Sequence, residues 1–442
     1  MNNVVIFGSG HVARPAIRTL LDSGHLVTVA TDEPEAARAM IGKHPQGQVR
    51  EVDASDPGDL RAAVRGADAA LSLLPVTFHV RVAEACVAER VSCVTTSYVS
   101  EEMRSLDGLA RRRGLLFLNE VGADPGIDHM QAMRLIDAVR AEGGRVTGFR
   151  SVCGGLPAPE AADNPLKYKL SWTPRGVVTA GGRRARYLEN GTLVPVPAFR
   201  IFEHAALIET AEFGPMESIP NGDSLRYLDE YGLEDVSTLF RGTLRWPGWS
   251  RTWTCLTALG YLDDAPDAAL ANATYAVEMW HAAGGREAES SRTAAARALA
   301  LDPSDPVLES LAWLGLFEDE PVPASTRSRM DLLVRRMEER LAYAPGERDM
   351  LVLQHELEWT DARERPRRTR AELTEYGSPS GDTAMSRTVG LPSACAVRRI
   401  LDGTIRETGV RIPTARSIYE PILNDLDTHG IRETVTEETP AA

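Results

Sequence analysis

The chain has 442 residues, of which 43% are hydrophobic and 25% are charged, and its formal net charge at pH 7 is −14. These proportions are ordinary for a globular protein, and the length exceeds what one hydrophobic core usually supports, so we expect two or three domains. The acidic balance argues against nucleic acid or an anionic membrane as a partner. No apolar run in the sequence approaches the ~20 residues that a membrane-spanning helix requires.

The sequence also carries expectations about location and metal content. The first predicted strand begins at residue 3, which leaves no room for a signal peptide. The 5 cysteines form no C-x-x-C pair, which favours reduced thiols and a cytoplasmic location. The 9 histidines show no metal-ligand spacing, so we expect no metal.

The clearest motif lies at the start of the chain. An apolar run at 3–7 precedes Gly8-Ser9-Gly10-His11-Val12-Ala13, a helical pattern follows, and a second apolar run covers 25–30. This G-x-G-x-x-A pattern, with Asp32 about twenty residues further on, is typical of a dinucleotide-binding strand–helix–strand unit. The first glycine allows the tight turn, the second lets a pyrophosphate approach the backbone, and the helix N-terminus supplies N–H donors. The alternative is a glycine turn without a ligand.

Strands and helices continue to alternate up to about residue 142. The expected helices are 35–41, 57–64, 80–88, 101–113 and 128–142, and the expected strands are 49–53, 69–74, 93–96 and 115–119. This alternation predicts an α/β fold with a doubly wound parallel sheet of the Rossmann type. Because ligands of such sheets lie beyond the carboxyl ends of the strands, the residues that follow each strand are the candidates for binding.

From residue 146 the pattern becomes that of an α+β domain. Residues 146–153, 350–358 and 371–375 look like strands, and 187–194 reads as a hairpin with an Asn-Gly turn. Residues 250–345 read as helices only, which predicts a helical domain inserted into the α+β domain. A helix at 393–401 is expected to fold back against the first domain, and the residues after 432 read as a polar tail.

Seven longer motifs occur beside these elements. They cover residues 95–100, 119–129, 153–160, 163–166, 168–172, 241–245 and 343–350. In content and order they resemble the saccharopine reductase family, also called L-glutamate-forming saccharopine dehydrogenases. The resemblance covers nearly the whole chain except the helical segment, which matches only loosely.

The resemblance implies three domains and a homodimer. A dinucleotide-binding domain would comprise 1–125, with 390–430 packing back onto it. An α+β substrate and dimerisation domain would comprise 126–249 and 346–389, and the inserted helical domain would comprise 250–345.

The resemblance also implies a reaction on small amino-acid substrates. The amine of glutamate condenses with the aldehyde of 2-aminoadipate 6-semialdehyde, water leaves, and a nicotinamide hydride reduces the imine to saccharopine. Two alternatives stay open. One is an opine-type dehydrogenase that uses another amino donor or aldehyde. The other is a redox sensor that binds a dinucleotide without turnover.

Three side chains are candidates for catalysis. Imine formation requires proton transfers, and side chains with tunable pKa values can carry them out. In this fold such side chains are expected just after strand ends. By resemblance, Tyr98, Asp124 and Cys153 line the reaction centre. Each also has a structural alternative: Asp124 as a helix cap, Tyr98 as a packing ring, and Cys153 as an inert buried thiol.

The resemblance and the strand-end rule together give the expected ligand contacts. The cofactor-binding set is Gly8, Ser9, Gly10, His11, Val12, Thr31, Asp32, Asp53, Ala54, Leu74, Thr96, Ser97, Gly122, Gly126 and His129. The substrate-binding set is Tyr98, Val99, Asp124, Arg175, Arg241, Thr243, Leu244 and Arg245. Arginine suits a substrate rich in carboxylates because its fork meets a carboxylate with two parallel bonds. The alternative for each arginine is a solvated surface charge.

The chain departs from the family at two positions. The family usually has Pro-Asn-Arg-Asp-Ser where this chain has Gly222 at the third place, so one substrate arginine is absent and Arg226 is the nearest substitute. Asp32 stands where the family's NADP-dependent members carry arginine. A carboxylate there favours NAD, because it accepts hydrogen bonds from the ribose hydroxyls. The alternative is that Asp32 caps the next helix while Arg38 or Lys43 reaches a phosphate.

Overall fold

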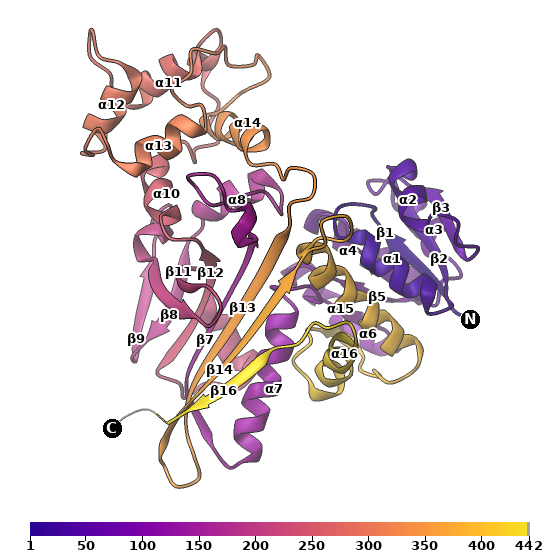
Figure 1. The fold of residues 1–442 in the computed structure, drawn as a ribbon. Coiled ribbons are helices and arrows are strands. Elements are labelled where there is room, and N and C mark those ends of the chain that lie inside the picture. The colour runs from indigo at the N-terminus through magenta and orange to yellow at the C-terminus, as the bar shows by residue number, and fades with distance from the viewer. Residues whose placement is uncertain (440–442) are drawn as a thin grey trace. The chain divides into compact units, whose positions relative to one another are not determined.

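A computed structural model of the protein describes residues 1–439 (Figure 1). Its internal contacts divide the chain into two units. Of the described residues, the first contains 1–145, 360–365 and 373–435, and the second contains 146–359, 366–372 and 436–439. Each unit is built around its own sheet.

The sheet of the first unit has seven strands, and all of its pairings are parallel. The strands are β1 (Asn3–Phe7), β2 (Leu26–Thr31), β3 (Gly47–Glu51), β4 (Ala69–Ser72), β5 (Ser92–Thr95), β6 (Leu116–Leu118) and β15 (Gly409–Arg411). Their order is β15-β6-β5-β4-β1-β2-β3. The chain leaves β3 and returns to the other side of β1 to form β4. The point at which the order reverses, where such sheets bind ligands, therefore lies between β1 and β4.

Helices connect and cover these strands. They are α1 (Ala13–Asp22), α2 (Pro34–Ile41), α3 (Pro57–Val64), α4 (His79–Glu89), α5 (Glu101–Ser105), α6 (Asp107–Arg113), α7 (Ile127–Ala141), α15 (Ala384–Leu401) and α16 (Arg416–Thr428). Helix α15 packs against α1, and α16 packs against both α15 and α7. A Cβ atom at Gly390 would lie 2.7 Å from the Val12 carbonyl oxygen, so a glycine is needed for α15 to approach the turn before α1 so closely.

The second sheet has nine strands. They are β7 (Arg145–Pro157), β8 (Ala185–Glu189), β9 (Thr192–Val196), β10 (Ala206–Thr210), β11 (Gly214–Pro220), β12 (Thr238–Arg245), β13 (Asp349–Thr360), β14 (Pro366–Tyr376) and β16 (Thr434–Glu438). Seven run in the order β10-β11-β12-β7-β13-β14-β16, and β8 pairs with both β12 and β9. The sheet is mixed, since β11 and β12 are antiparallel while β12 and β7 are parallel.

The remaining helices of the second unit are α8 (Pro174–Gly181), α9 (Tyr227–Tyr231), α10 (Trp249–Ala258), α11 (Tyr275–Ala282), α12 (Ser291–Ala298), α13 (Pro306–Trp313) and α14 (Arg329–Arg340). Four of them start at capping side chains that accept a backbone N–H: Thr274, Ser290, Asp305 and Ser328. Such caps satisfy the free donors of the first turn and fix where each helix begins. Helix α14 packs against α8.

The fold class expected from the sequence is confirmed. Most element boundaries differ by a few residues, but the helix expected at 393–401 begins at Ala384. The Asn190-Gly191 hairpin forms as expected, with φ of 48° and 78° at its two turn residues. The expected helix at 101–113 is two helices, α5 and α6, which meet at Leu106.

Residues 434–438 of the expected polar tail form strand β16, which the sequence analysis did not predict. All five residues of β16 are exposed, so it has no apolar alternation that would have indicated a strand. The sequence analysis also missed β15, which has only three residues, and the strands β10 to β12. The expected three-domain division stays a prediction. The contact-defined first unit extends past residue 125 and includes α7.

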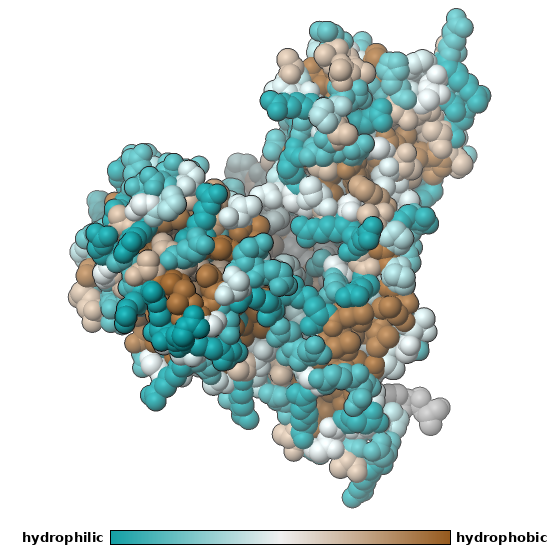
Figure 2. Space-filling model, turned by 180° about the vertical axis from the view of Figure 1, so that it is seen from behind, coloured by the Kyte–Doolittle hydropathy of each residue, from teal (hydrophilic) through white to brown (hydrophobic). Residues whose placement is uncertain are grey.

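Hydrophilic and hydrophobic side chains are mixed on the surface. Hydrophilic residues make up much of the visible surface in Figure 2, with hydrophobic residues gathered in smaller patches between them. This distribution is usual for globular proteins. Within residues 1–439, no helix is both long enough and apolar enough to cross a membrane.

Candidate functional site

The turn after β1 is shaped to receive a phosphate group. Gly8 has a φ of +97°, and a Cβ atom on it would lie 3.3 Å from the carbonyl carbon and oxygen of Leu73, so a glycine is required. At Gly10, by contrast, a Cβ atom would meet no heavy atom within 4 Å, which leaves the backbone open to a ligand. Helix α1 starts after Val12 with no side-chain cap and no acidic residue in its first turn. Its N–H donors and dipole therefore fit a pyrophosphate.

The end of β2 offers an uncommitted carboxylate. Ser9 and Thr31 hydrogen-bond through their hydroxyl oxygens at 2.8 Å, which ties the glycine turn to the second strand. The next residue, Asp32, is exposed and forms no hydrogen bond or ion pair with any residue of 1–439. Helix α2 begins after Glu33 without a side-chain cap, so Asp32 does not cap it. Arg38 forms an ion pair with Glu35.

The other expected cofactor residues of the first unit also follow strand ends. Asp53 and Ala54 follow β3, Leu74 follows β4, and Thr96 and Ser97 follow β5. Hydrogen bonds from the hydroxyl and the backbone N–H of Ser55, at 2.6 and 2.7 Å, lower the pKa of Asp53 and keep it ionised. His11 is exposed beside the turn.

His79, which the sequence analysis did not single out, joins two of these strand ends. Its Nδ1 lies 2.9 Å from the hydroxyl oxygen of Ser72, the last residue of β4, and its Nε2 lies 2.9 Å from that of Ser97. The ring is buried, and burial lowers the pKa of His79 to about 4. A neutral imidazole therefore holds Ser97 against β4. A histidine at the start of an apolar helix, seven residues after the end of β4, was the available sequence signal.

Tyr98 and Asp124 form a pair. The Tyr98 hydroxyl donates a hydrogen bond to Oδ1 of Asp124 across 2.9 Å, and both side chains are half-buried. Tyr98 lies in the loop after β5, and Asp124 lies between β6 and α7. The structure therefore brings together two of the three residues expected to be catalytic.

Glu120, another residue that the sequence analysis missed, holds the chain on both sides of Tyr98. Its backbone N–H donates to the Ser97 carbonyl oxygen at 3.2 Å, and its Oε1 accepts from the Val99 N–H at 2.9 Å. Its Oε2 lies 2.8 Å from Nε2 of His129. The Glu120 and His129 side chains are fully buried, and Glu120 has a φ of +59°, which is unusual for a residue with a side chain. This fixed geometry makes Glu120 a positioning residue for Tyr98.

Two expected cofactor residues shape the same loop. Gly126 has a φ of +149°, and a Cβ atom there would lie 2.0 Å from the Gly122 carbonyl oxygen, so no other residue fits. The backbone N–H of Gly122 donates to the Pro125 carbonyl oxygen at 2.9 Å. The buried ring of His129 contacts Glu120, so in this structure it supports the loop.

The second unit contains a small cavity of about 70 Å³. Thr243 and Arg245, both expected to bind substrate, line it together with Asn221, Gly222 and Arg183. None of the described residues that line it is acidic. One water molecule needs about 10–15 Å³ of such volume. The cavity is several times larger, so it has room for one end of an amino acid.

Aromatic rings hold Arg245 at this cavity. Its guanidinium lies 5.0 Å from the ring centre of Tyr168 and 5.3 Å from that of Trp249. Its Nη1 donates to the Leu244 carbonyl oxygen at 2.7 Å, and within residues 1–439 it has no carboxylate partner. Such a cation is preorganised and uncompensated, which suits a carboxylate ligand.

Three other residues of the expected set lie in the sheet beneath. Arg241 is 3% exposed, and its guanidinium lies 4.4 Å from the ring centre of Tyr227. Leu244 is fully buried and contributes its carbonyl oxygen. Cys153 is a buried residue of β7 and is the register partner of Thr243 in β12.

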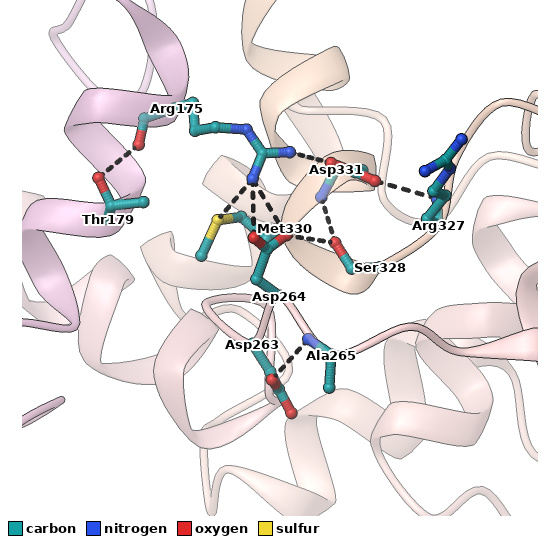
Figure 3. A network of polar contacts seen from close by, with 9 residues as sticks. All are labelled: Arg175, Thr179, Asp263, Asp264, Ala265, Arg327, Ser328, Met330 and Asp331. Atoms are coloured by element: carbon teal, nitrogen blue, oxygen red, sulfur yellow. Dashed lines mark hydrogen bonds and ion pairs between the residues drawn. The ribbon is translucent and has the colours of Figure 1, made fainter. Parts of the chain in front are cut away.

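Arg175 has other partners than expected. Figure 3 shows it extending from α8 to Asp264 and Asp331. Its Nη1 lies 3.0 Å from both carboxylate oxygens of Asp264, and its Nη2 bonds Asp331. It does not line the cavity. Its charge is compensated, so Arg175 ties α8 to the helical segment. Arg226, the expected substitute for the missing arginine, lies against the Tyr227 ring at 5.1 Å and does not line the cavity either.

Comparisons with known proteins point to one family along nearly the whole chain. Residues 4–118 match the family model of the saccharopine dehydrogenase NADP binding domain, and 122–431 match that of the saccharopine dehydrogenase C-terminal domain. The chain is 36% identical to saccharopine dehydrogenase [NADP(+), L-glutamate-forming] of Schizosaccharomyces pombe, over 99% of this chain and 100% of the relative. It is 35% identical to the protein of that name from Saccharomyces cerevisiae, over 97% of this chain and 98% of the relative.

A solved structure of the same family has a similar fold. The apo histidine-tagged saccharopine dehydrogenase (L-Glu forming) from Saccharomyces cerevisiae superposes with a TM-score of 0.91. The two chains are 32% identical, and the match covers 99% of this chain and 100% of the other.

Proposed function

Because the chain belongs to the saccharopine dehydrogenase family, we propose that it is an L-glutamate-forming saccharopine dehydrogenase. In the oxidative direction, saccharopine, oxidised nicotinamide dinucleotide and water give glutamate, 2-aminoadipate 6-semialdehyde, the reduced dinucleotide and a proton. The observation that carries this proposal is the match to relatives of that name over almost the full length of both chains.

The proposed chemistry has two stages. The carbon beside the secondary amine loses a hydride and the nitrogen loses a proton, which leaves an imine. Water then adds to the imine carbon, and the carbon–nitrogen bond of the resulting carbinolamine breaks to release glutamate. When bound, the nicotinamide accepts the hydride.

We assign proton transfer to the Tyr98–Asp124 pair. The Asp124 carboxylate can accept a proton, the Tyr98 hydroxyl can donate one, and their 2.9 Å hydrogen bond links the two functions. Glu120 and His79 act through Tyr98 and Ser97, which they hold in place. Cys153 is assigned to the substrate side beside Thr243, with no proton-transfer step of its own.

We assign substrate binding to the cavity of the second unit. Saccharopine and glutamate both carry several carboxylates. A cavity lined by Thr243 and Arg245, with no acidic residue in its described wall, attracts such groups by charge and offers them hydrogen-bond donors. Arg241 supports this strand from within the sheet.

The residues of the first unit fit a dinucleotide. Gly8, Gly10 and the uncapped start of α1 would hold the pyrophosphate, and Ser9 and Thr31 fix the turn beside it. For the adenosine ribose we propose a preference for NAD, which differs from the NADP(+) in the relatives' names. Asp32 supports the proposal, since its carboxylate is exposed and has no partner in the described chain.

Oxidation of saccharopine by the purified protein tests the function. We expect the nicotinamide to be reduced, which is measured by its absorbance, and glutamate to be released in equal amount. A folded protein that reduces neither dinucleotide with saccharopine would contradict the proposal. A panel of other amino donors in the reverse direction tests the opine-type alternative, which the glycine at position 222 keeps open.

A cytoplasmic location and a homodimer are two further proposals. The five cysteines are buried and form no disulfide bond in the described chain, which suits a reducing compartment. The homodimer rests on the family resemblance alone.

A further inference from the structure

The loop at Gly222 has room for a cation but supplies none. Gly222 lines the cavity with a φ of +62°, and a Cβ atom on it would meet no heavy atom within 4 Å. The position where the family usually carries an arginine therefore faces open space. A cation at this wall has to come from another segment.

The connection between α8 and β8 passes beside this gap. The backbone N–H of Arg186 donates to the Gly222 carbonyl oxygen at 3.0 Å. The Arg186 guanidinium also donates two hydrogen bonds to the Asp223 carboxylate, with Nε and Nη2 each 2.7 Å from one of its oxygens. These three bonds fasten the start of β8 to residues 222–223. Arg183, three residues earlier and in the connection between α8 and β8, lines the cavity together with Gly222.

The three arginines between residues 183 and 186 differ in whether a carboxylate compensates their charge. Arg186 is neutralised by Asp223. Arg183 is exposed, and its guanidinium forms no hydrogen bond or ion pair with any residue of 1–439. Arg184 is equally exposed and equally without a partner in the described chain, but it does not line the cavity. Arg183 and Arg245 therefore place two uncompensated guanidinium groups at one cavity.

We propose that Arg183 binds a substrate carboxylate and replaces the arginine that is missing at position 222. The ligand class is an α-amino dicarboxylate, and the inference rests on the proposed function for which such compounds are substrates. Arg183 is then a specificity-determining residue. It selects one carboxylate of the substrate, while Arg245, whose guanidinium lies against the rings of Tyr168 and Trp249, binds another.

The test compares Arg183→Ala with Arg184→Ala, a matched variant of the neighbouring arginine. Arg183→Ala should raise the KM for saccharopine about 5- to 50-fold, a range set by a charged hydrogen bond that is partly screened by water. The kcat should change less than about threefold, because Arg183 acts in binding. Arg184→Ala should leave both parameters within about twofold. An unchanged KM in Arg183→Ala, or an equal rise in Arg184→Ala, would overturn the inference.

A relocated cation provides a second test. In the Arg183→Ala background, Gly222→Arg should lower the KM again by at least about fivefold, because the new side chain enters the open space at the same wall. Gly222→Ala in that background tests the effect of backbone strain alone and should give no recovery. Equal results from both double variants would contradict the proposed location of the carboxylate.

Binding without turnover separates this inference from the proposed function. Calorimetry with glutamate and with 2-aminoadipate, on protein without cofactor, shows which half of saccharopine Arg183 contacts. A Kd raised at least about fivefold by Arg183→Ala for either ligand supports the inference, even if saccharopine is not oxidised. Saccharopine oxidation with unchanged Kd and KM in Arg183→Ala would keep the function and reject the inference. No binding and no oxidation by the unmodified protein would reject both.

Discussion

The phenol of Tyr98 donates a hydrogen bond to the carboxylate of Asp124 across 2.9 Å, although the two residues lie in loops after different strands. This hydrogen bond holds the phenol and the carboxylate in one relative position. Under the proposed function, this is the pair that exchanges protons with a nitrogen or an oxygen of the substrate.

Replacing Asp124 by alanine should lower kcat for saccharopine oxidation by about 10²- to 10⁴-fold, the range of a lost acid–base group. Binding of the dinucleotide should stay nearly intact, because Gly8 and Gly10 belong to a separate turn. Tyr98→Phe keeps the ring and should have a smaller effect. Steady-state kinetics and a cofactor titration measure both quantities. Unchanged kcat in folded Asp124→Ala would remove Asp124 from the mechanism.

Replacing Glu120 by alanine should destabilise the protein by about 3–5 kcal/mol, since it removes one partner of a buried pair and leaves the Val99 N–H unsatisfied. Glu120→Gln should be milder, because its amide oxygen can still accept the hydrogen bond from the Val99 N–H. Urea unfolding measures the difference. Equal stability of the two variants would show that the hydrogen bonds of Glu120 contribute little.

The stability of the protein should fall between pH 6.5 and about 4 through His79. The unfolded histidine binds a proton below its ordinary pKa of 6.5, whereas burial keeps the folded ring neutral down to about pH 4. The contribution is therefore complete above pH 6.5 and is lost as the pH falls to about 4. This shift corresponds to about 3 kcal/mol. The unfolding free energy of His79→Gln, measured over the same range, should lack this part of the slope. Parallel pH curves for both proteins would contradict the prediction.

Replacing Arg245 by lysine keeps the charge but loses the fork and the stacking on Tyr168 and Trp249. The KM for saccharopine should rise by the equivalent of about 1.5–3 kcal/mol. Arg175→Lys alters an arginine whose charge Asp264 and Asp331 already compensate. Its effect on KM should be at least about fivefold smaller. The opposite ranking would return Arg175 to the substrate site.

The ratio of kcat/KM with NAD to that with NADP should exceed one. A 2′-phosphate at about 4 Å from the Asp32 carboxylate meets a repulsion of about 1 kcal/mol in water, and of up to about 4 kcal/mol at an effective dielectric near 20. The preference for NAD is then about fivefold to several hundredfold at equal ionic strength. Asp32→Arg should shift it toward NADP. A preference of the unmodified protein for NADP would contradict the role given to Asp32.

Part of this protein is determined by short stretches of sequence. The G-x-G-x-x-A turn with Asp32 beyond the second strand predicts the first unit, because glycine and helix-start geometry are local properties. The alternation of strands and helices up to residue 141 likewise predicts the parallel sheet. The strands from 206 to 245 and β16 were missed, since their pairing partners, and not their own pattern, make them strands.

The tertiary structure decides whether the charge of each charged residue is compensated by a partner. Arg175, Arg183 and Arg245 look alike in the sequence. The partners of Arg175 are 89 and 156 residues away, and they alone distinguish it from the two arginines at the cavity. Glu120 holds Val99 across 21 residues. Charge compensation depends on distance in space, which the fold determines, and so the sequence supplied the residue types while the tertiary structure decided which of them are available to a ligand.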